Sequence, residues 1–263
     1  MNRIDAVFKQ LRRKKEKALI AYLTVGFPSV GMLPGLVDAC ADAGVDLLEL
    51  GVPFSDPLAD GPTIQAASER ALKQGVSPAL VLQQVKQLRR RKITMPIVLM
   101  TYYNPVLHYG LQRFCRDCEA SGVDGLIVPD LPPEEAGELI KAARATGLEV
   151  IFLAAPTSPR ERLTRLVKAS TGFIYYVSLT GVTGARKSLP AQIASHVRAI
   201  KGMTHLPVCV GFGISKPAQV QEIVRVADGA IVGSALVDLI GRSGRRAPQA
   251  AYRFLHGLKE ACQ

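Results

Sequence analysis

The stretch 45-VDLLELG-51 is apolar at nearly every position and does not alternate between apolar and polar residues. Such a run is typical of a strand in a parallel sheet that is covered on both faces. Seven further runs share the pattern: 18-ALIAYLT-24, 96-PIVLMTY-102, 124-DGLIVPD-130, 149-EVIFLAA-155, 173-FIYYVSL-179, 206-LPVCVGF-212 and 228-DGAIVGS-234. We therefore predict eight parallel strands.

Segments with helical spacing separate these runs, and several begin with a proline in the expected first turn, as at Ser77-Pro78. The expected helices are 2–15, 31–44, 62–75, 77–91, 110–122, 132–147, 158–170, 216–227, 235–240 and 248–260. Eight β-then-α units predict an α/β fold, a (β/α)8 TIM barrel with extra helices at the N-terminus and after the second strand. An open doubly wound sheet is the alternative, but no G-x-G-x-x-G follows the first strand. No linker divides the chain, so we expect one domain, 1–263.

The composition argues against several classes of function. The net charge is +11, and the excess clusters at Arg12-Arg13-Lys14-Lys15 and Arg89-Arg90-Arg91-Lys92 without interleaved aromatic residues, which argues against nucleic-acid binding. No apolar run is long enough to span a membrane. Five scattered cysteines predict a cytoplasmic chain with reduced thiols. No cluster of histidines or carboxylates has metal-ligand spacing, so no metal is expected.

Two acidic residues stand out in 46-DLLELGVPFSDPLADGP-62. Glu49 lies near the carboxyl end of the second strand, and the carboxyl ends of barrel strands form the active site. In the helix layer this carboxylate would be buried without an obvious partner, at a cost of several kcal/mol, so we expect it to face the barrel mouth. Pairing with a nearby basic residue is the alternative. Asp60, on the following loop, is either a second carboxylate in the same mouth or a turn or helix N-cap.

Glycines at the ends of the last three strands predict an anion site. They lie in 180-TGVTGAR-186, in 211-GFGIS-215 and at Gly233-Ser234, which precedes a short helix. Backbone N–H groups near glycines and a helix N-terminus bind phosphate, and this is the recurring arrangement in barrels. Tyr22, Tyr102, Tyr175 and Phe212 either hold a flat apolar group or are ordinary core residues. No strand-end lysine suits a Schiff base, which leaves proton transfer or carbon–carbon cleavage by acid–base groups.

The segment 47-LLELGVPFSDPLADGPTIQAASERAL-72 closely resembles the signature of the tryptophan synthase alpha chain family. The resemblance covers nearly the whole chain and continues through 101-TYYNPV-106, 124-DGLIVPDLPPEE-135, 153-LAAPTS-158, 181-GVTGAR-186, 211-GFGIS-215 and 233-GSALV-237. It implies a lyase that splits indole-3-glycerol phosphate into indole and glyceraldehyde 3-phosphate by acid–base catalysis. The flat apolar group is then indole.

The resemblance also implies roles for particular residues. Glu49 is expected to be the general acid–base, and Asp60 to stabilise positive charge at the indole nitrogen. Thr183 is expected to bind Asp60 and help close the site. The residues expected to position the substrate are Tyr175, Thr183, Tyr22 and Tyr102, and those expected to bind phosphate are Gly184, Gly213, Gly233 and Ser234.

A partner is implied as well. In the family the loop of Asp56 faces a beta chain, a pyridoxal-phosphate enzyme that receives indole through a tunnel. The resemblance therefore implies an alpha2-beta2 heterotetramer, with pyridoxal phosphate in the beta chain and no cofactor in this one. The expected interface residues lie on loops: Asp56, Pro53, Asn104, Pro105 and Pro132.

Three positions depart from the familiar pattern. Leu179 replaces an arginine of several relatives, which puts a loop-closing salt bridge in doubt. Tyr22 stands where phenylalanine is frequent, and Pro129 where a small residue is often found. The alternatives are a free-standing indole-3-glycerol phosphate lyase, another phosphorylated-substrate barrel such as a sugar-phosphate isomerase, and a non-catalytic phosphate-binding regulatory barrel.

Overall fold

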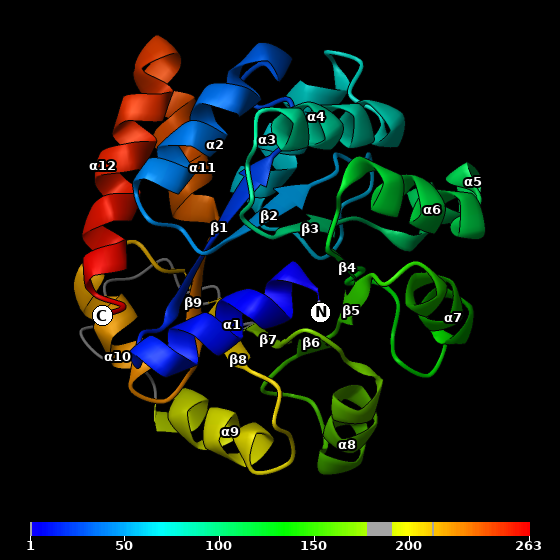
Figure 1. Cartoon of the computed structure of the whole chain (residues 1–263), viewed down its shortest axis with the longest axis vertical. Helices are drawn as coiled ribbons and strands as arrows, with labels where there is room; N and C mark the ends of the chain where they lie inside the picture. The colour runs from blue at the N-terminus through cyan, green and yellow to red at the C-terminus, as the bar shows by residue number, and fades with distance from the viewer. Residues whose placement is uncertain (1, 178–190, 212) are drawn as a thin grey trace.

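The computed structural model describes residues 2–177, 191–211 and 213–263, which form a closed parallel barrel surrounded by helices (Figure 1). The strands are β1 (Ala18–Thr24), β2 (Leu47–Gly51), β3 (Ile97–Met100), β4 (Gly125–Ile127), β5 (Glu149–Ile151), β6 (Leu153–Ala154), β7 (Ile174–Val177), β8 (Val208–Gly211) and β9 (Gly229–Val232). Their order is β5-β4-β3-β2-β1-β9-β8-β7-β6. The predicted fifth strand is divided at Phe152 into β5 and β6, the two ends of this order, so a single run of chain closes the barrel.

Helices pack around this barrel. Most correspond to predicted segments, with some different boundaries, but those at Tyr103–Tyr109 and Ala191–Lys201 were not predicted. The helices are α1 (Arg3–Lys14), α2 (Leu33–Asp42), α3 (Pro62–Leu72), α4 (Pro78–Arg90), α5 (Tyr103–Tyr109), α6 (Leu111–Ser121), α7 (Gly137–Ala145), α8 (Arg160–Ala169), α9 (Ala191–Lys201), α10 (Pro217–Val224), α11 (Ser234–Ser243) and α12 (Ala247–Glu260), with 3-10 turns at Val30–Met32 and Gly244–Arg246. Within the described part of the chain, no helix has the length and apolarity needed to cross a membrane.

Two of the helix predictions need correction. The helix expected from residue 132 begins at Gly137, because the Glu135 N–H bonds to the Pro132 carbonyl in a turn and the first α-helical bond runs from Ile140 to Ala136. Asn104 and Pro105 do not lie on a loop: they belong to the first turn of α5, where proline loses no helical hydrogen bond.

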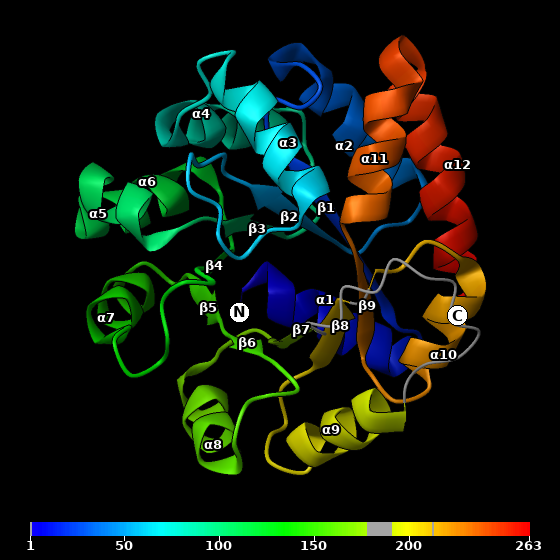
Figure 2. The ribbon, with the colours of Figure 1, turned by 180° about the vertical axis from the view of Figure 1, so that it is seen from behind.

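The alternation of side chains along each strand sorts residues between two cores. In β2, Leu48 and Leu50 pack outward in the large cluster beneath the helices, whereas Leu47 belongs to a smaller cluster inside the barrel. Helix α1 lies across one end of the barrel and adds Ile4, Phe8 and Leu11 to the inner cluster, which Figure 1 shows from that side. The opposite end, where α3 and α11 contact β1, faces the viewer in Figure 2.

Three aspartates, one buried and two partly buried, connect the strands at the end covered by α1. Asp124, 3% exposed, accepts hydrogen bonds from the Ile97 N–H at 2.8 Å, from Arg89 at 2.6 Å and from Arg3 at 2.9 Å. Asp46 and Asp228 likewise each accept a bond from the neighbouring strand's backbone and from lysines. These groups tie the amino ends of adjacent strands together, at the end where barrels gain stability rather than activity.

Replacing Asp124 with alanine will lower the free energy of unfolding by about 3–5 kcal/mol, because the largely buried Arg89 loses its carboxylate partner. Asp38→Ala is the matched control, since the Arg91–Asp38 pair is partly exposed and should contribute less than about 1 kcal/mol. Urea denaturation measures both. Equal losses in the two variants would contradict this account of Asp124.

Candidate active site

Glu49 lies inside the barrel. It shares its face of β2 with Leu47, pairs in register with Tyr22 of β1 and Val98 of β3, and is 1% exposed. Both carboxyl oxygens are buried, and no described residue forms a hydrogen bond with either. The alternative that Glu49 pairs with a neighbouring basic residue is therefore excluded among the described residues.

This environment determines the charge of Glu49. Burial, with a smaller contribution from the charge of Asp60, raises the pKa of Glu49 to about 8. Desolvation disfavours the carboxylate because no donor replaces the lost water. Glu49 is consequently protonated at neutral pH and able to act as an acid.

Asp60 is held at the same end of the barrel by Tyr102. The Tyr102 hydroxyl donates a hydrogen bond of 3.0 Å to Asp60 Oδ2 and accepts one of 3.0 Å from the Ala59 N–H, while the Phe54 ring lies 5.3 Å from the Tyr102 ring. Burial raises the pKa of Asp60 to about 6, and the Tyr102 bond opposes this rise. Asp60 is thus largely ionised at pH 7. Asp60 also closes a turn, since its N–H bonds to the Pro57 carbonyl, but it is not the helix cap, because Gly61 is the N-cap of α3.

Two tyrosine rings extend toward the mouth across strand-end glycines. A Cβ on Gly51 would lie 2.0 Å from the Tyr22 hydroxyl, and one on Gly211 would lie 2.8 Å from the Tyr175 hydroxyl. Any side chain at either glycine would displace a ring from the site. Sequence reasoning missed this function of Gly51 and Gly211. The available signal was a glycine two residues beyond an inward-facing position at a strand end.

The expected phosphate site is described in part. Gly233 is the N-cap of α11 with no side-chain bond to cap it, and Ser234 is exposed in the first turn. Gly213 adopts a φ of +43° beside open space. The N-terminus of α11 thus presents backbone N–H groups and positive potential near the mouth. Thr183, Gly184, Leu179 and Phe212 lie outside the described residues.

The expected interface residues come after β2, β3 and β4 in the chain, and they differ in exposure. Asp56 and Asn104 are exposed, Pro105 and Pro132 are partly buried, and Pro53 is buried. Leu58, beside Asp56, is 92% exposed, and Leu107 on α5 is 50% exposed. Sequence reasoning missed these two leucines, because a pattern cannot show which apolar residue of a short loop remains uncovered.

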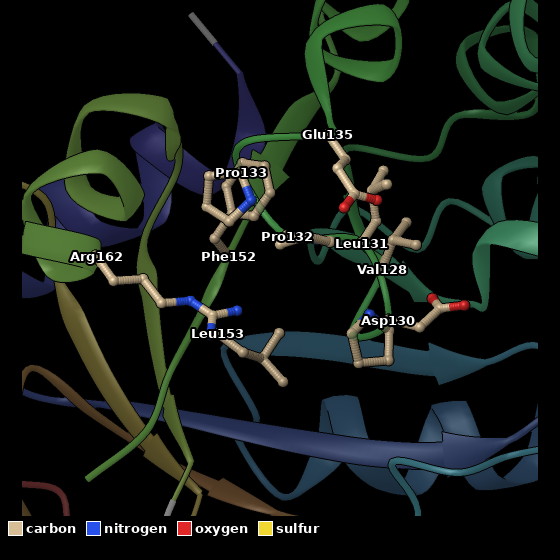
Figure 3. Close-up of a pocket in the computed structure, with 10 residues that line it drawn as sticks. Val128, Asp130, Leu131, Pro132, Pro133, Glu135, Phe152, Leu153 and Arg162 are labelled. Carbon is tan, nitrogen blue, oxygen red and sulfur yellow. The ribbon is translucent and has the colours of Figure 1, made fainter. Parts of the chain in front are cut away.

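A cavity of about 390 Å³ lies beside the mouth, between the segments that follow β4 and β5 (Figure 3). Most of the surface that lines it is polar, and the side chain of Arg162 extends over it. Leu153 lines this cavity and also packs against the inner cluster. Neither Glu49 nor Asp60 lines it.

A closed parallel barrel with one protonated and one ionised carboxyl at its mouth, and a helix N-terminus two strands away from Glu49, defines an acid–base barrel enzyme suited to a phosphorylated substrate. The family model described as tryptophan synthase alpha chain matches residues 8–262. The tryptophan synthase alpha chain of Chloroflexus aggregans is 53% identical over 242 residues, 92% of this chain and 91% of that protein. The Geobacter sulfurreducens alpha chain is 47% identical over 262 residues, 99% of each.

Solved structures agree. The crystal structure of tryptophan synthase subunit alpha from Legionella pneumophila superposes with a TM-score of 0.93 at 36% identity, covering 100% of this chain and 98% of that one. A chain of a Mycobacterium tuberculosis tryptophan synthase structure gives 0.90 at 38% identity, covering 100% and 99%. The chain belongs to the tryptophan synthase alpha chain family. It is a carbon–carbon lyase, and the predictions of barrel, family and activity are confirmed.

The pKa of Glu49 leads to a prediction about stability. The folded chain keeps a proton on Glu49 up to a pH of about 8, whereas the free group releases it near 4.5, so stability should fall as pH rises between these values. Glu49→Gln removes this titration. The unfolding free energy of the Glu49→Gln variant minus that of the parent should therefore increase by on the order of 3 kcal/mol from pH 5 to pH 8.

Chemical denaturation across this pH range measures the difference. Glu69→Gln is the control: the Glu69 pKa is lowered by its bond to Lys73, so both folded and unfolded chains are ionised here and its curve should run parallel to the parent's. A Glu49→Gln curve that also runs parallel would contradict the raised pKa.

Proposed function

We propose that Glu49 and Asp60 carry out the family's reaction in this chain, the cleavage of indole-3-glycerol phosphate to indole and glyceraldehyde 3-phosphate. The observation that supports this most directly is the protonated, unpartnered carboxyl of Glu49 inside the barrel, beside an ionised Asp60. A general acid with a pKa near the working pH has a proton to give and a conjugate base able to take one back.

The chemistry requires both states of Glu49. Neutral Glu49 donates its proton to the indole carbon that bears the side chain, and the ring nitrogen becomes positively charged. The resulting carboxylate then takes the proton from the adjacent side-chain hydroxyl. The oxygen forms a carbonyl, the carbon–carbon bond breaks, and its electron pair restores the aromatic indole.

Asp60 stabilises the intermediate. Its carboxylate lies at the mouth, where it attracts the positive charge that develops on the indole nitrogen. Tyr102 keeps Asp60 ionised and holds the end of its loop by two hydrogen bonds, while Tyr175 and Tyr22 flank the carboxyl pair. Thr183 completes this set by binding Asp60 when the site closes, as the family resemblance implies.

The substrate phosphate binds beyond the end of β9, two strands around the barrel from Glu49. The first turn of α11, with Gly233 and Ser234, supplies N–H donors, and Gly213 allows the backbone to approach. The family resemblance adds Gly184, which lies outside the described residues. This placement leaves the indole ring over the inner apolar residues, within reach of both carboxyls.

A beta chain receives the indole. The Mycobacterium tuberculosis structures are of tryptophan synthase. Apolar and polar residues are exposed on the segments that follow β2 and β3, namely Leu58, Leu107, Asp56 and Asn104. With Pro53, Pro105 and Pro132 they would contact the partner in an alpha2-beta2 heterotetramer. Pyridoxal phosphate belongs to that partner, and none is required here. We expect the complex in the cytoplasm.

Indole release from indole-3-glycerol phosphate tests this assignment, with and without a cognate beta chain. Glu49→Gln should lower the rate at least about 10³-fold, and Asp60→Asn at least about 10²-fold, because each removes a group that acts on the transition state. The beta chain should accelerate the parent but rescue neither variant. Near-parental release by Glu49→Gln would overturn the assignment, and Glu69→Gln should match the parent.

The phosphate site is tested by Ser234→Asp. A carboxylate in the first turn of α11 interacts favourably with the helix dipole and stabilises the folded chain by about 0.3–1 kcal/mol. The melting temperature should therefore not fall. It repels the substrate phosphate, so KM should rise about 10-fold or more. Ser234→Ala is the neutral control. An unchanged KM in Ser234→Asp would place the phosphate elsewhere.

A further inference from the structure

Tyr22 lies between the two halves of the proposed site, and its hydroxyl lies on the Glu49 side, against Gly51. In the sheet, Tyr22 pairs with Glu49 on one side, and on the other side a Cβ on Gly233 would lie 3.6 Å from the Tyr22 Cβ. Adjacent strands are about 4.8 Å apart, so Tyr22 separates the acid from the phosphate-binding turn by one strand on each side. The substrate segment that spans this gap is the glycerol chain.

The ring directs the hydroxyl toward the mouth. Ile64 and Ala67 of α3 and Val237 of α11 pack in one cluster with Tyr22, and the residue is 6% exposed. The hydroxyl lies against Gly51, which is two residues beyond Glu49 on the same face of β2, so it stands nearer the mouth than the Glu49 backbone. Its position is thus held by packing from two helices.

The hydroxyl has a proton to donate. Its one described bond is received from Thr24 Oγ1 at 3.4 Å, longer than the usual distance of about 2.7–2.8 Å between hydroxyl oxygens. Among the described residues, no group accepts the Tyr22 proton. Burial and the nearby charge of Asp60 raise the pKa of Tyr22, so the phenol stays protonated. A buried donor without an acceptor is costly unless a ligand supplies one.

We propose that the Tyr22 hydroxyl donates a hydrogen bond to a hydroxyl oxygen of the substrate's glycerol chain and so selects for a hydroxylated linker between the ring and the phosphate. The inference rests on the proposed placement of the acid and the phosphate in the preceding subsection. Phenylalanine at this position would supply the same packing surface but no donor. Tyr22 therefore adds a specificity contact for the part of the substrate between the ring and the phosphate.

Binding to catalytically silenced protein tests the proposal. Glu49→Gln and Glu49→Gln/Tyr22→Phe are compared by calorimetry with two ligands, indole-3-glycerol phosphate and 3-(indol-3-yl)propyl phosphate, which lacks both side-chain hydroxyls. Removing the donor should weaken binding of the hydroxylated ligand about 10-fold and change binding of the other less than about 2-fold. Thr24→Val, added to Glu49→Gln, should produce a smaller loss with the same ligand preference.

The outcomes separate the two proposals. Equal weakening of both ligands would show that the Tyr22→Phe change only disturbs packing, and no change with either would show that the hydroxyl makes no contact. Each result overturns the inference while leaving the phosphate and carboxyl assignments intact. If Glu49→Gln binds neither ligand, the proposed site itself fails and the inference with it. Tyr252→Phe, at an exposed tyrosine on α12, should change neither affinity.

Discussion

The active end of this molecule depends on one carboxyl group that is enclosed in an apolar barrel without a hydrogen-bond partner among the described residues. Glu49 retains its proton because neither water nor a described donor solvates its charge. The pairing of β2 with β1 and β3 fixes the side chain in this position, since a shift of one residue would turn Glu49 into the helix layer. Its usefulness as an acid and its cost to the fold therefore have the same origin.

The acidic residues at the two ends of the barrel differ in their hydrogen bonding. Beneath α1, the buried Asp124 and the partly buried Asp46 accept bonds from arginine or lysine and from backbone N–H groups. At the mouth, Glu49 has no such bond, and Asp60 is held by one tyrosine. Stability is concentrated where the carboxylates are satisfied, and reactivity where they are not, which is the usual division of a barrel.

The sequence was sufficient to predict the barrel, because helical segments separate its eight apolar runs and this α/β order permits few other arrangements. It located Glu49 by the cost of burying a carboxylate in the helix layer. It did not reveal that Phe152 interrupts a strand, since β5 and β6 bond to different neighbours around a closed sheet. The contacts of Tyr22 with Gly51 and Tyr175 with Gly211 depend on three-dimensional packing, which no local pattern encodes.

The order of strands around the barrel has a consequence for the nascent chain. β1 is synthesised first, yet one of its two neighbours is β9, through the pairing of Ala18 with Gly229. During translation β1 therefore keeps an unpaired edge until almost the entire polypeptide has left the ribosome. An open edge of this kind is prone to associate with other strands. Protection of that edge by chaperones or by α1 would matter most in the interval before β9 arrives.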